Sequence, residues 1–284
     1  MPELPEVETI RAGLAPLLGG RTLTGVRVLH PRPVRSHPGG PADFEAILIG
    51  RTFAEPRRRG KYLWLPFNDG DALLVHLGMS GQFRLNQADD PLARNTRVLF
   101  DLDDGPDQLR FIDQRMFGGL ALSSGGAELP DEVKHIALDP LDPAFDLAGT
   151  ATRLQHKRST IKRALLDQTL VSGIGNIYAD ESLWRARTHY DQPTRAISTR
   201  RAAMVLRAVQ DVLAEALEQG GTSFDSLYVN VNGSSGFFSR SLNAYGQQGR
   251  PCPRCGTPMV REHFMNRSSY LCPRCQRLQR SDSR

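Results

Sequence analysis

The first residues after the start methionine, PELPEVET, bring one amine and two carboxylates close together in the chain. Removal of Met1 would leave Pro2 with a free secondary amine, and roughly a tenth of α-amines are unprotonated at pH 7, against about one in 2,500 lysines. Such an amine attacks electrophilic carbon and forms an iminium. Glu3 and Glu6 are spaced to serve beside it as an acid and as a stabiliser of positive charge. Taken alone, the same residues fit an ordinary helix start better, with Pro5 in the first turn.

The four cysteines of the chain form two C-x-x-C pairs. Sixteen residues separate the pairs, which is typical of four-cysteine zinc sites, where the thiolates close a tetrahedral structural site without an open position for catalysis. Two disulfides are the alternative, and an N-terminus without the layout of a secretory leader argues against them. We therefore predict one structural zinc ion per chain, held by Cys252, Cys255, Cys272 and Cys275.

The positive charge of the chain is concentrated near its C-terminus. Residues 240–284 contain nine arginines and two acidic residues, a net charge of +7, so the total of +5 leaves −2 for residues 1–239. A basic segment of this kind is typical of proteins that bind a polyanion, although a solvated tail fits the composition equally well. No stretch reaches the roughly 18 apolar residues that span a bilayer. We predict a cytoplasmic protein without a membrane partner.

The elements that position these candidate residues change in type along the chain. The N-terminal motif begins a segment with helical signals, which ends at Gly19 and Gly20. Short alternating runs follow, with the turn sequences NDG and DDG between some of them. They predict a β-sandwich or barrel-like domain with strands in 23–30, 61–78, 96–113 and 118–124.

The second half of the chain has helical periodicity. Residues 125–150, rich in Gly, Pro, Asp and Ala, are interpreted as a connection between domains. Ser159 and Ser198 are predicted N-caps and Gly220 ends the last helix; the helices are predicted in 159–168, 176–187 and 198–221. A polar, glycine-rich stretch at 221–241 is predicted to be a loop, and the cysteine pairs follow it.

Six blocks follow one another along the chain: PELPEVET, RRRGKYLWL, HLGMSG, DQRMFGG, LLDQTLVSGIGNIYADESLWRA and the pair CPRC…CPRC. In this order they resemble the formamidopyrimidine-DNA glycosylases, the bacterial repair enzymes for 8-oxoguanine. The resemblance spans the whole chain and implies an α+β multidomain fold. Its parts are an N-terminal helix with a β-sandwich catalytic domain in 1–130, a linker in 131–150, a helix–two-turn–helix DNA-binding domain in 151–240 and a four-cysteine zinc-finger hairpin in 241–284.

The resemblance implies a bifunctional DNA glycosylase and abasic-site lyase that acts on oxidised purines in double-stranded DNA during base excision repair. Pro2 matches the nucleophile that attacks C1′ and forms a Schiff base. Glu3 matches the acid that protonates the sugar ring oxygen or the leaving group, and Glu6 matches the carboxylate that supports the charged intermediate. Lys61 matches a lysine assigned to β-elimination. Arg267 matches a zinc-finger arginine that contacts phosphate and is implicated in δ-elimination, for which its forked, permanently charged group is suited.

The resemblance also implies residues that hold the DNA once the target base is extruded from the stack. Met79 matches the side chain that fills the vacated stack, Arg115 the one that reaches the orphaned base, and Phe117 the wedge beside it. Neighbouring glycines favour exposed loop tips over core positions for Met79 and Phe117. Phosphate contacts are implied for Arg158, Lys162 and Asn176. The stretch near Asn232–Phe238 matches the loop that closes over the flipped base.

Two departures from the family pattern concern the DNA contacts. Asn95 aligns with a DNA-contacting histidine, and DQRMFGG carries Gln114 and Met116 in place of two family residues. Two alternative functions remain. One is an endonuclease VIII-like glycosylase for oxidised pyrimidines, against which Leu4 argues. The other is a zinc protein that binds damaged DNA without catalysis. The family also implies a monomer that is associated with the nucleoid when it acts on DNA.

Overall fold

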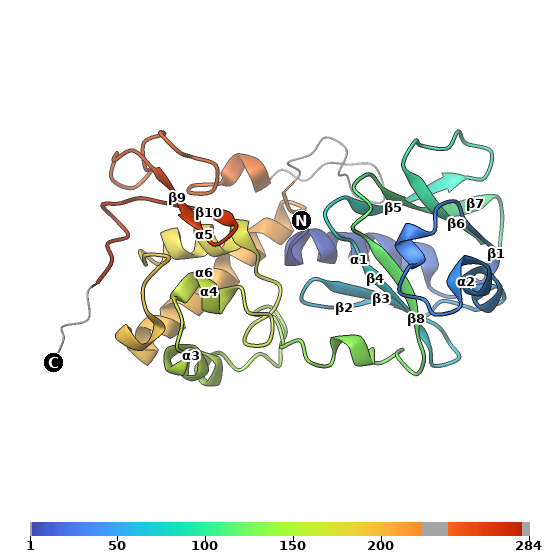
Figure 1. Ribbon diagram of the computed structural model, residues 1–284, viewed down its shortest axis with the longest axis horizontal. Coiled ribbons are helices and arrows are strands. Elements are labelled where there is room, and N and C mark those ends of the chain that lie inside the picture. Colours follow the sequence, from blue (N-terminus) through green and yellow to red (C-terminus); the bar gives the residue numbers. More distant parts are fainter. Residues whose placement is uncertain (1, 223–237, 280–284) are drawn as a thin grey trace. The chain divides into compact units, whose positions relative to one another are not determined.

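The computed structural model of the protein describes residues 2–222 and 238–279. These residues form two compact units (Figure 1). The first unit contains residues 2–135 together with 220–222, and the second contains residues 136–219 together with 238–279. Apart from Phe238, the predicted loop near Asn232–Phe238 lies outside the described residues.

The first unit is built on two four-stranded antiparallel sheets (Figure 1). One sheet has the order β1-β6-β7-β5, with strands at Leu23–Val28 (β1), Thr96–Leu102 (β6), Asp107–Asp113 (β7) and Gly81–Gln87 (β5). The other has the order β2-β3-β4-β8, with strands at Arg57–Arg59 (β2), Tyr62–Pro66 (β3), Ala72–His76 (β4) and Gly119–Ser123 (β8). The turn sequences NDG and DDG connect β3 to β4 and β6 to β7, as predicted.

One apolar core joins both sheets to two helices, α1 (Leu4–Leu18) and α2 (Gly40–Leu48). The predicted N-terminal helix is confirmed as α1, and it buries one face at the three- and four-residue spacing of a helix: Val7, Ile10, Leu14 and Leu18. The sequence did not predict α2, β2 or β5. α2 was missed because it is short, begins in a Gly- and Pro-rich stretch, and buries only Phe44 and Leu48.

The second unit contains four helices and a β-hairpin among its described residues. They are α3 (Leu147–His156), α4 (Ile161–Leu165), α5 (Asn176–Arg185), α6 (Thr199–Glu218), β9 (Val260–Phe264) and β10 (Arg267–Leu271). The predicted N-cap Ser198 is confirmed, since its side chain accepts a hydrogen bond from the N–H of Arg201. Ser159 is not an N-cap, because α4 begins two residues later and Thr160 holds that position. The sequence did not predict α3, which begins within the segment 125–150 interpreted as a connection and continues to His156.

The predicted α+β fold class is therefore confirmed: a β-sandwich with an N-terminal helix, a helical region and a hairpin between the cysteine pairs. Four short 3₁₀ helices complete the described elements, at Arg32–Val34, Asp131–Val133, Thr194–Ala196 and Phe238–Ser241. None of the described helices combines the length and apolar character needed to cross a membrane.

Candidate active site and DNA interface

Pro2, Glu3 and Glu6 lie together at the start of α1, and all three are buried. Glu3 is the N-cap and Glu6 is the third residue of the helix. Each side chain accepts a hydrogen bond from the backbone N–H of the other, and the Glu3 nitrogen lies 2.9 Å from Glu6 Oε2. This capping box fixes two carboxyl groups beside the residue that carries the predicted nucleophile.

Thr222 reaches the same site from a distant part of the chain. Its backbone N–H and its hydroxyl group both donate to Glu6 Oε1, at 2.7 and 2.8 Å. Gly221 permits this approach: its φ is +77°, and a Cβ there would lie only 2.9 Å from the same oxygen. Together with the N–H of Glu3, three donors converge on the Glu6 carboxylate and hold it in one orientation.

A cluster of charged side chains ties α1 to β2. Glu8 accepts hydrogen bonds from Arg11 Nη2 and from Arg58 Nε, both at 2.8 Å. Burial would raise the pKa of Glu8, but the hydrogen bonds from Arg11 and Arg58 outweigh it and hold the pKa below its usual value. The cluster therefore fixes the helix that begins at the candidate site against the β2–β3 hairpin.

Lys61 lies on the turn of that hairpin. Arg59 pairs with Tyr62, so Gly60 and Lys61 form the two-residue connection between the strands. Gly60 has a φ of +57°, which a glycine adopts without strain. The fold thus places Lys61 on the hairpin that packs against α1.

Met79, Arg115 and Phe117 lie on two neighbouring loops of the first unit, one after β4 and one after β7. Met79 is 41% exposed and Phe117 is 51% exposed, and Arg115 is exposed as well. Arg115 Nη1 lies 3.7 Å from Met79 Sδ. The structure therefore brings two of these side chains into contact and places all three outside the core.

Asn95 lies in the turn before β6 and is half-buried. Its Oδ1 accepts a hydrogen bond from Arg97 Nη2 at 3.1 Å, and its backbone carbonyl accepts one from the N–H of Asp113 at 2.9 Å. Asn95 thus belongs to the framework beneath the loop that carries Arg115.

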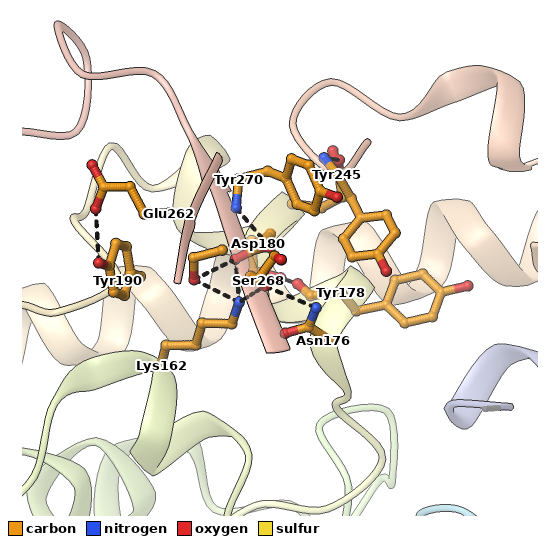
Figure 2. Close-up of polar contacts among 12 residues, drawn as sticks. Lys162, Asn176, Tyr178, Asp180, Tyr190, Tyr245, Glu262, Ser268 and Tyr270 are labelled. Atoms are coloured by element: carbon orange, nitrogen blue, oxygen red, sulfur yellow. Dashed lines mark hydrogen bonds and ion pairs between the residues drawn. The ribbon is translucent and has the colours of Figure 1, made fainter. Parts of the chain in front are cut away.

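Lys162 lies deep in the second unit, between α5 and β10 (Figure 2). Its side chain is 0% exposed, and Nζ donates to Asp180 Oδ1 at 2.7 Å and to Ser269 Oγ at 2.6 Å. These hydrogen bonds connect α4, which carries Lys162, to α5 and to β10. The phosphate contact that the resemblance implies for Lys162 stays a prediction.

Two adjacent carboxylates of α5 are buried, and each holds a different segment. Asp180 accepts a hydrogen bond from the Tyr270 N–H at 3.0 Å (Figure 2), and Glu181 accepts three from the backbone N–H groups of residues 243–245. Burial raises the pKa of both groups, that of Asp180 to about 7 despite the opposing effect of Lys162. The two carboxylates of α5 thus hold β10 and the segment 243–245 against this helix.

Asn176 is the first residue of α5. Its Nδ2 donates to the Ser268 carbonyl at 3.0 Å (Figure 2), while its buried Oδ1 has no hydrogen-bond partner among the described residues. The N-terminal N–H groups of a helix and its dipole favour anions, so this position suits a phosphate. Arg158 and Arg267 are both exposed, and Arg267 is the first residue of β10.

The four cysteines form one cluster in the second unit. All four sulfur atoms lie within 4.8 Å of one another, and Cys255 Sγ is 3.5 Å from Cys272 Sγ. No disulfide joins these cysteines. Thiolates about 2.3 Å from one zinc ion would be separated by about 3.8 Å in a tetrahedron, so the cluster fits this metal. Trp184 of α5 packs beside it and donates its indole N–H to Cys252 Sγ at 3.4 Å.

Three family models match the chain in order. They are the formamidopyrimidine-DNA glycosylase N-terminal domain over residues 1–120, the H2TH domain of the same glycosylases over residues 136–227, and the zinc finger found in FPG and IleRS over residues 249–278. The chain belongs to the formamidopyrimidine-DNA glycosylase family. The resemblance stated from the sequence blocks is confirmed.

Individual members of the family agree with this assignment. The formamidopyrimidine-DNA glycosylase of Salinispora arenicola is 58% identical over 277 residues, 97% of this chain and 96% of its own. Lactococcus lactis Fpg, solved with abasic-site DNA, is 33% identical with a TM-score of 0.87, covering 97% of this chain and 99% of that one. A variant of the same enzyme, solved with Fapy-dG DNA, has a TM-score of 0.89 at 33% identity, with 97% and 100% covered.

Membership in this glycosylase family confirms several predictions made from the sequence. The chain is a DNA glycosylase of base excision repair with abasic-site lyase activity, and its partner is DNA. The zinc-finger match and the sulfur cluster confirm one structural zinc ion at the four cysteines.

Several residues that build this glycosylase's site were not predicted. Thr222 was missed because 216 positions separate it from Glu6, and nothing local marks it. Asp180 and Glu181 did carry a signal: in the helix sequence IYADESLW, two adjacent acids stand between apolar residues at both ends, which indicates buried partners.

Proposed function

We propose that this glycosylase excises oxidised purines, 8-oxoguanine and formamidopyrimidines, from duplex DNA through a Schiff base at Pro2 and then cuts the strand by β,δ-elimination. The observation that carries the proposal is the arrangement at the start of α1, where a capping box orients two buried carboxyl groups beside Pro2. Supporting evidence comes from the L. lactis relative, which has been solved with abasic-site DNA and, as a variant, with Fapy-dG DNA.

Removal of Met1 leaves Pro2 with a free amine. In the proposed first step, the lone pair of the Pro2 nitrogen attacks C1′ of the damaged nucleotide, and the bond from C1′ to the base breaks. Glu3 supplies one proton, to the departing base or to the sugar ring oxygen, and the proton that the Pro2 nitrogen loses goes to the other. The sugar ring opens, and an iminium forms between the Pro2 nitrogen and C1′. The Glu6 carboxylate, fixed by Glu3 and Thr222, stabilises this positive charge without having to reorganise.

Two eliminations complete the proposed reaction. Loss of a proton from C2′ expels the 3′ phosphate, and loss of a proton from C4′ then expels the 5′ phosphate, so a one-nucleotide gap remains. Water then hydrolyses the iminium and releases Pro2. We assign the first elimination to Lys61, on the hairpin turn beside α1. We assign the second to Arg267, whose exposed guanidinium suits a phosphate contact.

Further residues are proposed to hold the DNA. Met79 fills the gap left by the extruded base, Arg115 reaches the orphaned base, and Phe117 wedges beside it; their exposure on two adjacent loops supports these roles. We propose that Arg158, Lys162 and Asn176 contact DNA phosphates and that Asn95 contacts the DNA. We further propose that the enzyme acts as a monomer, in the cytoplasm and at the nucleoid.

Covalent trapping tests the proposed chemistry. Borohydride reduction on an 8-oxoguanine·cytosine duplex, followed by peptide mass spectrometry, should give an adduct at Pro2. A chain with one extra residue before Pro2 is the matched control, and it should bind the duplex without forming the adduct. Trapping on an oxidised-pyrimidine duplex alone would favour the endonuclease VIII-like alternative. Tight binding with no adduct on either duplex would leave a protein that binds damage without catalysis.

A further inference from the structure

The two loops that carry Met79, Arg115 and Phe117 come from different parts of the sequence, yet they are built as one piece. β5 and β7 are neighbours in the sheet (Figure 1), and their register places Gly81 opposite Asp113. Ser80, at the end of the first loop, therefore lies beside Asp113, where the second loop begins.

Asp113 and Ser80 join the loops through side-chain hydrogen bonds. Asp113 is fully buried, and its Oδ1 accepts a hydrogen bond from the Ser80 hydroxyl at 2.5 Å. Its Oδ2 accepts one from the Gly118 N–H at 2.7 Å. The Ser80 oxygen in turn accepts from the N–H of Arg115 at 2.8 Å. One buried carboxylate thus holds both ends of the second loop, and one hydroxyl group fixes the backbone of Arg115 to the residue after Met79.

Backbone packing strengthens this connection. Gly78 has a φ of +61°, and a Cβ there would lie 2.5 Å from the Phe117 carbonyl carbon and 2.6 Å from the Gly118 nitrogen. The two loops therefore touch at a point where no side chain fits. From the other side, Arg35 Nη1 donates to the Gly118 carbonyl at 2.6 Å.

We infer that Ser80 and Asp113 are positioning residues that lock the two loops together and so determine which base opposite the lesion the enzyme accepts. This inference rests on the proposed roles of Met79, Arg115 and Phe117. If Arg115 reads the orphaned base, its reach is set by the position of its backbone relative to Met79. The Ser80 hydroxyl fixes that position, because it bonds the Arg115 N–H and the Asp113 carboxylate at once.

The test compares single-turnover excision of 8-oxoguanine opposite cytosine and opposite adenine. Ser80→Ala removes the hydroxyl group that donates to Asp113 and accepts from the Arg115 N–H. We expect the ratio of the excision rate opposite cytosine to the excision rate opposite adenine to fall about tenfold, the effect of losing one hydrogen bond to a charged group. Ser80→Thr keeps the hydroxyl group and should retain the ratio.

Two further variants keep the outcomes distinct. Gly78→Ala forces the loops apart by a different route and should lower the ratio as Ser80→Ala does. Arg115→Ala tests the proposed role of Arg115, and the trapping experiment at Pro2 tests the proposed excision separately. If Arg115→Ala lowers the ratio while Ser80→Ala and Gly78→Ala leave it unchanged, the positioning inference fails and the proposed role of Arg115 stands. If Arg115→Ala leaves the ratio unchanged, the role of Arg115 and the positioning inference both fail.

Discussion

Replacing Lys162 with methionine tests whether a buried ion pair stabilises the packing of β10 against α5. Methionine keeps an unbranched apolar side chain but removes the ammonium, so Asp180 loses the partner that lies 2.7 Å away. The exposed fractions of the two side chains are 0% and 1%, and water therefore does not take the place of the lost group.

The expected magnitude follows from this geometry. At an effective dielectric constant of about 20, unit charges at this separation attract by about 6 kcal/mol, and the desolvation of both ions opposes that gain. Removal of one partner of a buried pair costs about 3–5 kcal/mol, because the other charge stays buried. Asp180 keeps its bond from the Tyr270 N–H, so we expect the lower part of that range for the free energy of unfolding of the second unit.

The penalty should also depend on pH. Burial already raises the pKa of Asp180 to about 7, and loss of the lowering effect of Lys162 raises it further. The folded pKa of Asp180 then exceeds its unfolded value of 3.8, so the folded state prefers the protonated carboxyl group. The stability that this preference gives the protein is complete below pH 3.8 and is lost as the pH rises through the folded pKa. Lys162→Met should therefore cost less at about pH 5.5 than at about pH 8, and adding Asp180→Asn should remove the difference.

Urea unfolding of the zinc-loaded chain measures this effect. The chain has two tryptophans, and a Trp64→Phe background leaves Trp184 to report the second unit. Lys157→Met is the matched control: its pair with Asp167 is 35% and 29% exposed, so its loss should cost less than about 1 kcal/mol. Equal losses for Lys162→Met and Lys157→Met would refute the reasoning. A large loss at Lys162 that does not change with pH would refute the part that concerns Asp180.

Three further predictions concern the zinc ion, the active site and α1. Removing the zinc with a strong chelator should lower DNA affinity and abolish amide-exchange protection in β9 and β10, because the metal supplies most of the hairpin's folding free energy. Protection in β6 and β7 should not change. Equal loss of protection in all four strands would contradict this prediction. Thr222→Val removes one of three donors to Glu6 and should slow single-turnover excision about tenfold, with recovery in Thr222→Ser. Glu8→Gln should lower the Tm at pH 7. The difference should shrink as the pH falls from 4.5 through the lower folded pKa of Glu8, because the stability from a carboxylate with a lowered pKa is complete above its unfolded value and is lost through its folded one. A Tm difference that persists at still lower pH would show that lost packing is responsible.

The features that the sequence alone determined are those written in short, local patterns. The spacing of the cysteines predicted the metal, because a tetrahedral thiolate site needs two close pairs on a short chain segment. The helix at the N-terminus and the hairpins at NDG and DDG followed from periodicity and turn residues, which depend on neighbours in the chain. The N-terminal motif, with the blocks behind it, predicted the family.

The tertiary structure decided how these parts are held. Nothing in the sequence joins Thr222 to Glu6, or Ser80 to Asp113, because each pair meets only after the strands and helices between them have folded. The sequence resemblance implies a phosphate contact for Lys162, and nothing in the sequence predicts that its side chain is buried. Whether a charged side chain lies in solvent or inside depends on whether another element supplies a counter-charge, and here α5 supplies Asp180. That partner is a property of packing, and no local pattern around Lys162 contains it.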